Sequence, residues 1–175
     1  MPETSAALQG LPPYPLAGIP ELKRKLIADG VDLIDLGAGD ADLLPPPAVR
    51  TALTAAIEDP SMSRYGFQLG LTTFREAIAA WMRRRFGIEL DPFAELLPLI
   101  GSKEGIAHLP LAYLNPGDLA IIPDPGYQAY EGGVVLAGGG VVRLPLRVEN
   151  GFLMDLEEIP ADQLAKAKLL YMNYP

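Results

Sequence analysis

Residues 96–114 read LLPLIGSKEGIAHLPLAYL, and this stretch decides the fold. A short apolar run ends at Gly101, polar residues and a second glycine follow, and apolar residues then return. The pattern predicts a strand near 97–100, a tight turn, and a helix near 103–113. Strands that alternate with helices in this way are typical of α/β proteins.

The predicted turn has the chemistry of an anion site. A helix N-terminus carries N–H groups without partners and the positive end of the helix dipole, and the Ser102 hydroxyl and the Lys103 ammonium stand beside it. Such a point binds a phosphate. An ordinary helix cap, with Ser102 as N-cap and Gly101 permitting the turn, explains the same residues. A Walker loop is excluded because its glycine and lysine spacing does not occur.

The alternation of strands and helices continues to the end of the sequence. Short apolar runs are bounded by glycine, proline and aspartate, and helical segments lie between them. The predicted elements are a strand at 119–123, a helix near 127–137, a strand near 141–146, a helix near 161–167 and a strand at 168–172. We therefore expect an α/β fold with a mostly parallel sheet that is covered on both faces.

Three loops follow predicted strands at one edge of this sheet, where ligands bind in α/β proteins. They span residues 101–103, 124–127 and 173–175. Tyr127 comes directly after a proline and a glycine, and its ring can stack on a flat ligand held at the turn. Packing of the ring as an ordinary aromatic at a helix start explains the position equally well.

The sequence before residue 96 predicts a less regular organisation. Residues 1–20 hold five prolines, so we expect an extended arm that gains order only by lying on another part of the protein. Val31–Leu36 alternates apolar and acidic residues, as a half-exposed strand does. Helices are expected at 21–28, at 48–58, and from a cap at Thr72 or Thr73 to about 85, where Gly87 ends the last one.

Two glycines at 37 and 39 follow the predicted strand at 31–36. They do not form the dinucleotide-binding fingerprint, because the third glycine is missing and prolines follow. Closely spaced glycines let the backbone approach a ligand, or they only make a turn. Gly39 is therefore a candidate for ligand contact, with a plain turn as the alternative.

Composition excludes several classes of function. The net charge of −8 argues against nucleic acid as a partner. The absence of cysteine removes thiolate nucleophiles and cysteine-based zinc sites, and it favours a reducing, cytoplasmic location. Neither a signal peptide nor a membrane span is expected. His108, the single histidine, suits a structural position in a helix, so few residues remain that could form a Ser-His-Asp triad or a metal site.

Five segments together resemble the N-terminal half of a class I/II aminotransferase, which is a pyridoxal-phosphate enzyme of fold type I. They are LIDLGAGDAD, SRYGFQLGLTTFREAIAAWM, LIGSKEGIAHLPLAYLNPGD, IPDPGYQAY and LLYMNYP. The similarity covers roughly residues 10–175 and is closest to the branch that contains LL-diaminopimelate aminotransferase. It implies an incomplete three-layer large domain at 46–175, preceded by an arm and part of a small domain at 1–45.

The resemblance also implies roles for particular residues around pyridoxal 5′-phosphate. Ser102 and Lys103 match the pair that meets the cofactor phosphate, and Tyr127 matches the aromatic residue that stacks on the pyridine ring. Tyr65 matches a tyrosine that reaches the cofactor phosphate of the neighbouring subunit, which implies a homodimer with shared active sites. Among substrate contacts, Gly39 matches a backbone contact to the α-carboxylate, and Tyr14 matches a substrate-side tyrosine. The implied substrates are an amino acid and a 2-oxo acid.

The catalytic group of the family is not in these residues. The lysine that forms a Schiff base with the cofactor matches a position downstream of Pro175, and Lys103 belongs to the phosphate turn instead. We therefore expect a truncated chain that does not transaminate by itself and that exposes an apolar sheet edge prone to aggregation. Two alternatives remain open: a lyase or synthase of the same fold, and a non-catalytic fragment or cofactor-binding remnant.

Overall fold

The chain forms two units in a computed structural model that describes residues 2–14, 16–37, 39, 41, 43–64 and 70–173. The sheet unit comprises Met1–Gly18 and Leu99–Pro175, and the helical unit comprises Ile19–Pro98. The boundary between domains that the sequence predicts after residue 45 stays a prediction.

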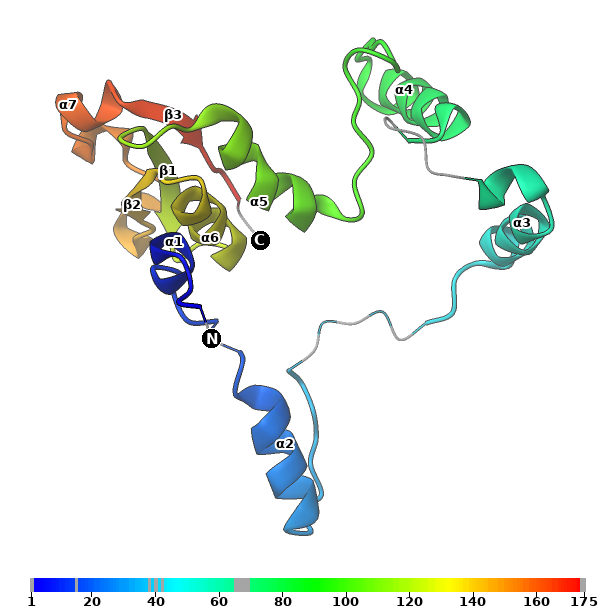
Figure 1. Cartoon of the computed structure of the whole chain (residues 1–175), viewed down its shortest axis with the longest axis horizontal. Helices are drawn as coiled ribbons and strands as arrows, with labels where there is room; N and C mark the ends of the chain where they lie inside the picture. The colour runs from blue at the N-terminus through cyan, green and yellow to red at the C-terminus, as the bar shows by residue number, and fades with distance from the viewer. Residues whose placement is uncertain are drawn as a thin grey trace. The chain divides into compact units, whose positions relative to one another are not determined.

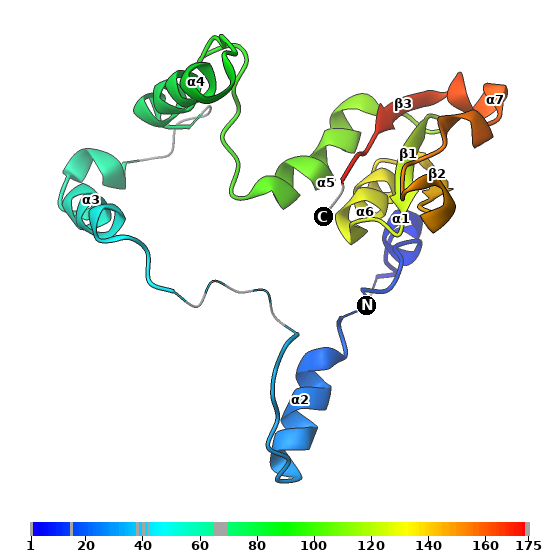
Figure 2. The ribbon, with the colours of Figure 1, turned by 180° about the vertical axis from the view of Figure 1, so that it is seen from behind.

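The sheet unit is built on three parallel strands in the order β2-β1-β3, which can be followed in Figures 1 and 2. They are β1 (Leu119–Asp124), β2 (Gly140–Pro145) and β3 (Ala167–Leu170). The helices of this unit are α1 (Ala6–Gln9), α5 (Ser102–Tyr113), α6 (Gln128–Leu136) and α7 (Ala161–Leu164), with short 3₁₀ turns at Val148–Asn150 and Leu156–Glu158. The predicted α/β fold with a parallel sheet is therefore confirmed.

Side chains of β1 alternate between two apolar clusters, one on each face of the sheet. Ala120 and Ile122 pack on the face that α5 and α6 cover, together with Leu114 and Val134. Ile121 points the other way and contacts a cluster that includes Leu144 and Ile159. All of these side chains are buried. This alternation is the period of two that a strand requires, so β1 is the buried central strand of the sheet.

Two predicted strands are absent from the structure. Residues 97–100 are irregular, and so is Val31–Leu36. Pro98 lacks an N–H for a ladder, and the side chains of Leu36 and Ile100 are at least nine-tenths exposed. A strand forms only where a neighbouring strand completes its hydrogen bonds, and neither segment has such a neighbour among the described residues.

The N-terminal arm is also more regular than the predicted extended chain. Ser5 caps the short helix α1 by accepting a hydrogen bond from the Leu8 N–H. The arm lies on α6, where the Leu11 side chain lies close to Gly132. The arm thus lies on another element, as expected, but it includes one turn of helix; that it gains order only there stays a prediction.

The helical unit contains α2 (Ile19–Ala28), α3 (Pro47–Ile57), a 3₁₀ turn at Pro60–Ser63, and α4 (Thr72–Phe86). All three predicted helices are present. Gly87 ends α4 with a φ of 70°, as predicted, but Leu71 is the N-cap residue, so the predicted threonine cap is wrong. Arg75 is buried in this unit, and its Nη2 donates to the Leu96 carbonyl at 3.1 Å. Arg75 thus ties the segment after α4 to that helix.

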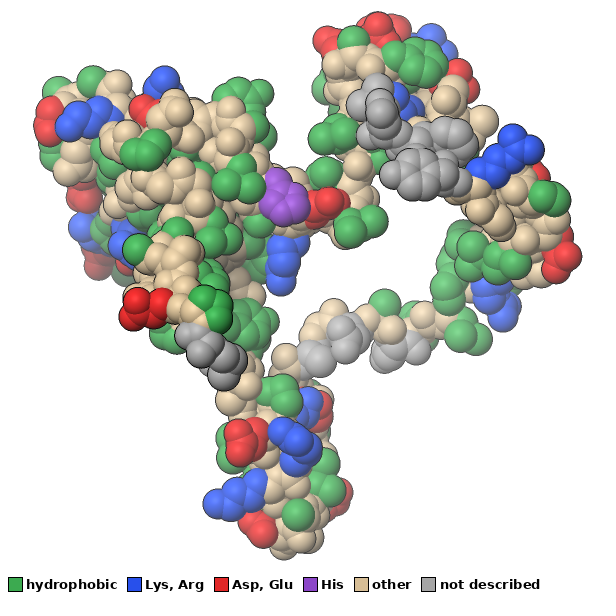
Figure 3. Space-filling view, in the orientation of Figure 1, with side chains coloured by type: hydrophobic (Ala, Val, Ile, Leu, Met, Phe, Trp, Pro, Cys, Tyr) green, Lys and Arg blue, Asp and Glu red, His purple; other side chains and the backbone are tan. Residues whose placement is uncertain are grey.

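Many large apolar side chains remain exposed in both units, and Figure 3 shows hydrophobic groups across the visible surface. The most exposed among the described residues are Ile34, Leu36, Leu43 and Ile100, each more than four-fifths accessible. His108 lies on α5 and is also exposed (Figure 3), which agrees with a structural helix position and not with a buried catalytic residue.

Candidate functional site

The turn that enters α5 leaves N–H groups free at a point beside Lys103. Gly101 is the N-cap, and its φ of 96° and ψ of 149° belong to a region that only glycine adopts readily. Ser102 is the first helical residue, so the alternative that makes Ser102 the N-cap is wrong. Gly101 has no side chain to bond to the N–H groups of the first turn, which leaves the N–H groups of Ser102 and Lys103 available for an anion.

Glu104 contributes to the same turn, and sequence reasoning missed it. Its Oε2 accepts the N–H of Ile100 at 2.7 Å, and its own N–H donates to the Gly101 carbonyl at 3.2 Å. The signal was present, because an acidic residue in the first turn of a helix often reaches back to the preceding backbone. The carboxylate thus links residue 104 to residue 100 and holds the turn at Gly101 between them.

Lys103 lies beside the aromatic ring that begins α6. Its Nζ is 5.4 Å from the centroid of the Tyr127 ring, within the range of a cation–π interaction. Interaction with the Tyr127 hydroxyl is the main cause that raises the pKa of Lys103, and Tyr14 adds a smaller effect of the same sign. Lys103 is therefore fully charged at neutral pH. The structure brings together three predicted site residues, Lys103, Tyr127 and Tyr14.

The Tyr127 ring rests against a pair of buried tyrosines. Tyr127 meets Tyr130 edge-on, with 5.8 Å between ring centroids, and Tyr130 stacks on Tyr171 at 4.5 Å. Burial raises the pKa of both Tyr130 and Tyr171, so each hydroxyl stays protonated. The Tyr127 side chain is 36% exposed, so it packs on its own helix and also presents accessible surface. The packing alternative therefore describes part of the environment of Tyr127, and stacking of its ring on a ligand stays a prediction.

Tyr171 supports α5 through a bond that the helix itself lacks. Pro110 lies inside α5 and has no N–H, so the carbonyl of Ile106, four residues earlier, has no helical donor. The Tyr171 hydroxyl donates to that carbonyl at 3.0 Å. The end of β3 and the helix of the Gly101 turn are thereby joined. Sequence spacing of Pro110 and Ile106 signals the free carbonyl, but not the donor.

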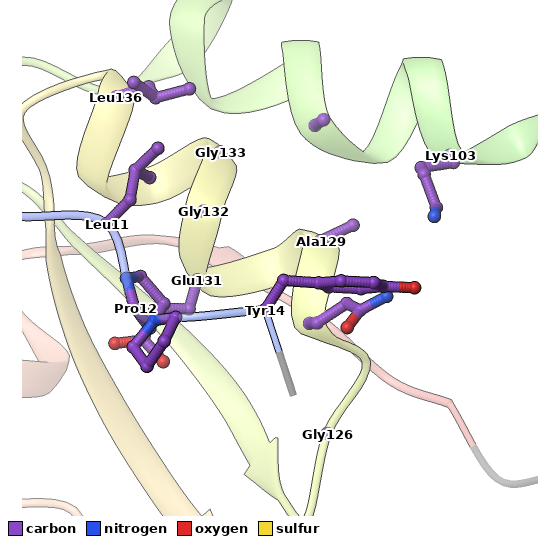
Figure 4. Close-up of a pocket in the computed structure, with 13 residues that line it drawn as sticks. Leu11, Pro12, Tyr14, Lys103, Gly126, Ala129, Glu131, Gly132, Gly133 and Leu136 are labelled. Atoms are coloured by element: carbon purple, nitrogen blue, oxygen red, sulfur yellow. The ribbon is translucent and has the colours of Figure 1, made fainter. Parts of the chain in front are cut away.

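A cavity of about 490 Å³ opens beside Lys103, between α5, α6 and the arm. Figure 4 shows the Tyr14 side chain running from the arm along α6 toward the side where Lys103 lies. Glu131 is a second charged residue of the wall, and it is ion-paired with Arg143. The charge of Lys103 therefore faces a cavity whose volume suits a small ligand.

The structure does not test the roles predicted for Gly39 and Tyr65. Gly39 belongs to the helical unit, near a turn in which Asp35 pairs with Lys23 and accepts the Gly37 N–H at 2.9 Å. These two contacts, that of Lys23 first, lower the pKa of Asp35. Tyr65 lies outside the described residues. The roles of Gly39 and Tyr65 stay predictions.

The described part of the chain contains no cluster of three or more histidine, cysteine or acidic residues that could hold a metal ion. Across the same residues, every helix is too short or too polar to cross a bilayer.

Known proteins match this chain over nearly all of its length. The family model described as aminotransferase class I and II matches residues 31–175. LL-diaminopimelate aminotransferase of Syntrophobacter fumaroxidans is 51% identical over 168 residues, which is 96% of this chain and 43% of that protein. The enzyme of the same name from Aquifex aeolicus is 47% identical over 173 residues, covering 99% of this chain and 45% of that protein.

The fold matches a solved structure equally well. The apo structure of BacF from Bacillus subtilis superimposes with a TM-score of 0.92 and 36% identity over 100% of this chain, which corresponds to 45% of the BacF chain. The chain thus spans less than half the length of the relatives that it matches.

Proposed function

Because this chain belongs to the aminotransferase class I and II family, we propose that it is the N-terminal portion of an enzyme that transfers an amino group between an amino acid and a 2-oxo acid. The observation that carries the proposal is the Gly101 turn, where free N–H groups and the Lys103 ammonium lie beside the Tyr127 ring. That combination suits a ligand with a phosphate and a flat ring.

Pyridoxal 5′-phosphate is the cofactor that we propose for this site, and the residues present fit it. The N–H groups of Ser102 and Lys103 and the raised pKa of Lys103 suit a doubly charged phosphate. The accessible Tyr127 ring suits a planar heterocycle. When bound, this cofactor supplies an electron sink for the substrate's α-carbon.

The residues of this chain bind and orient, and none of them is proposed as a proton carrier. In the proposal, Ser102 and Lys103 hold the phosphate, and Tyr127 fixes the plane of the ring. Tyr14 closes the arm side of the cavity and contacts substrate, whereas Gly39 contacts the substrate carboxylate. Tyr65 reaches the site of a second subunit, so the enzyme is a homodimer. A cytoplasmic location is part of the proposal and rests on the absence of cysteine.

LL-diaminopimelate is the first substrate to test, because relatives about half identical to this chain carry its name. A solved structure of Thermus thermophilus aspartate aminotransferase, 29% identical with a TM-score of 0.82, shares the same fold. The scaffold therefore accommodates different amino donors, and identity alone does not select one.

The test begins with the coding frame and the intact mass of the native polypeptide. The polypeptide that the frame encodes is then purified, loaded with pyridoxal 5′-phosphate, and mixed with LL-diaminopimelate and 2-oxoglutarate. We expect glutamate to form, and the 175 residues alone to form none. A loaded, folded protein that transfers no amino group from any of the common amino acids would contradict the proposal. Elimination or condensation products would instead favour a lyase or synthase.

A further inference from the structure

We propose that Glu104 is a positioning residue for the anion-binding turn, which it holds through the N–H of Ile100. This inference rests on the proposed function for its ligand, and it adds a residue with no assigned role. The carboxylate of Glu104 accepts the Ile100 N–H at 2.7 Å, across Gly101. The N–H groups of Ser102 and Lys103 lie within the turn that this hydrogen bond spans.

The sign of the Glu104 charge makes this role specific. A carboxylate in the first turn of a helix is attracted to the helix dipole, but it repels a phosphate bound at the same end. A residue that acted through charge alone would therefore weaken phosphate binding. A residue that holds the turn in its binding geometry strengthens phosphate binding despite its charge, because the free N–H groups then need no reordering when the anion binds.

The backbone at Gly101 needs such a restraint. Glycine reaches its φ of 96° readily, but it also has more conformational freedom than any other residue. Without the Glu104 bond, the Ile100 N–H has no other partner among the described residues, and within that part of the chain the turn keeps the bond from the Glu104 N–H to the Gly101 carbonyl. The Glu104 side chain is therefore the contact that fixes how the chain enters α5.

Two substitutions separate geometry from charge. Glu104→Gln keeps the side-chain length and an acceptor oxygen but removes the charge, whereas Glu104→Asp keeps the charge but is one methylene too short to reach Ile100. The probes are pyridoxine 5′-phosphate and pyridoxine, which lack the aldehyde and cannot react with lysines. Affinities are measured by calorimetry on the polypeptide that the coding frame encodes, freed of bound cofactor.

The positioning role predicts that Glu104→Gln binds pyridoxine 5′-phosphate within about twofold of wild type and that Glu104→Asp binds it about tenfold more weakly. Binding of pyridoxine should change in neither variant, because it has no phosphate. The opposite pattern, with tighter binding in Glu104→Gln and unchanged binding in Glu104→Asp, would show a charge effect and overturn the proposal.

A matched control exists in the helical unit. Glu95 accepts the N–H of Asp91, four residues earlier, at 2.8 Å, which is the same kind of bond. Glu95→Asp should leave phosphate affinity unchanged, and a tenfold loss in this control would show that the effect is general destabilisation.

Amide hydrogen exchange gives a readout that needs no ligand. The Ile100 amide should exchange faster in Glu104→Asp but not in Glu104→Gln, and equal protection in all three proteins would refute the positioning role. Wild-type protein that binds no pyridoxine 5′-phosphate would contradict the proposed cofactor site instead. The rate of amide hydrogen exchange at Ile100 would still decide the role of Glu104.

Discussion

Lys103 provides the most direct test at the scale of a single residue. Lys103→Ala removes the ammonium that faces the cavity, and hydrogen bonds to charged groups contribute about 1.5–3 kcal/mol. We expect the affinity for pyridoxine 5′-phosphate to fall at least about tenfold, as measured by calorimetry. Lys166→Ala is the control, because Lys166 stands at the opposite edge of the sheet, where its carbonyl accepts the Leu119 N–H. Equal losses in both variants would contradict the assignment.

Tyr171 offers a second residue-scale prediction, which depends on the proline inside α5. Tyr171→Phe leaves the Ile106 carbonyl without a donor, so the free energy of unfolding should fall by about 1–3 kcal/mol. Pro110→Ala gives α5 an N–H that can reach the same carbonyl. In that background Tyr171→Phe should cost less, and denaturant titrations of the four proteins form the cycle. Strict additivity would mean that Ile106 does not couple the two positions.

The same tyrosines predict a dependence on alkaline pH. Burial raises the pKa of Tyr130 and Tyr171 above the usual value of 10.0, so the folded state holds these protons more tightly than the unfolded state. This contribution to stability is complete below pH 10 and is lost as pH rises through the folded pKa values. Tyr171→Phe should therefore show a shallower fall in the free energy of unfolding as the pH rises above about 10. An identical slope in both proteins would refute this origin.

At the scale of elements, the contact between α5 and α6 depends on one of two adjacent glycines. A Cβ on Gly133 would lie 2.6 Å from the Ala107 carbonyl oxygen, whereas one on Gly132 would meet only Leu11, at 3.9 Å. Gly133→Ala forces the helices apart and should lower the free energy of unfolding by about 1–3 kcal/mol. Gly132→Ala should be neutral or stabilising by about 0.5–1 kcal/mol, as measured by denaturant titration. Similar effects at both positions would contradict the contact.

Elements could be predicted from the sequence where the sequence signal is local and strong. Helices α2, α3 and α4 follow from periodicity and end signals such as Pro47 and Gly87, and β1 follows from its continuous apolar run. The predicted strands at 31–36 and 97–100 failed because a strand depends on a neighbour that periodicity does not reveal.

The site was predictable to a similar extent. Tyr127 follows β1, so the topology predicts its place at the carboxyl end of the sheet. Lys103 lies beside Tyr127, although the strand expected before the Lys103 loop does not form. Glu104 was missed although an acidic residue in the first turn of a helix signals such a contact. Tyr171 acts through a contact 65 residues apart in sequence, which spacing could not supply.

For the whole molecule, exposed apolar surface predicts self-association of the 175-residue chain. Ile34, Leu36, Leu43 and Ile100 are each more than four-fifths accessible, and large apolar side chains exposed to this extent favour association with other protein. We expect the mass from light scattering to rise with concentration, and added salt to increase it, because salt screens the repulsion from a net charge of −8. A constant monomer mass at all concentrations would contradict this.

The strand order β2-β1-β3 also determines when each pair of strands can form during synthesis. The central strand β1 leaves the ribosome before both of its neighbours, and its pairing with β3 waits until residue 170 has emerged. The Gly101 turn is made about seventy residues before Tyr171 arrives to support its helix. Contacts so distant in sequence form slowly, and unpaired strands attract other chains meanwhile. Nascent chains that pause before β3 is complete should therefore be the ones that chaperones bind.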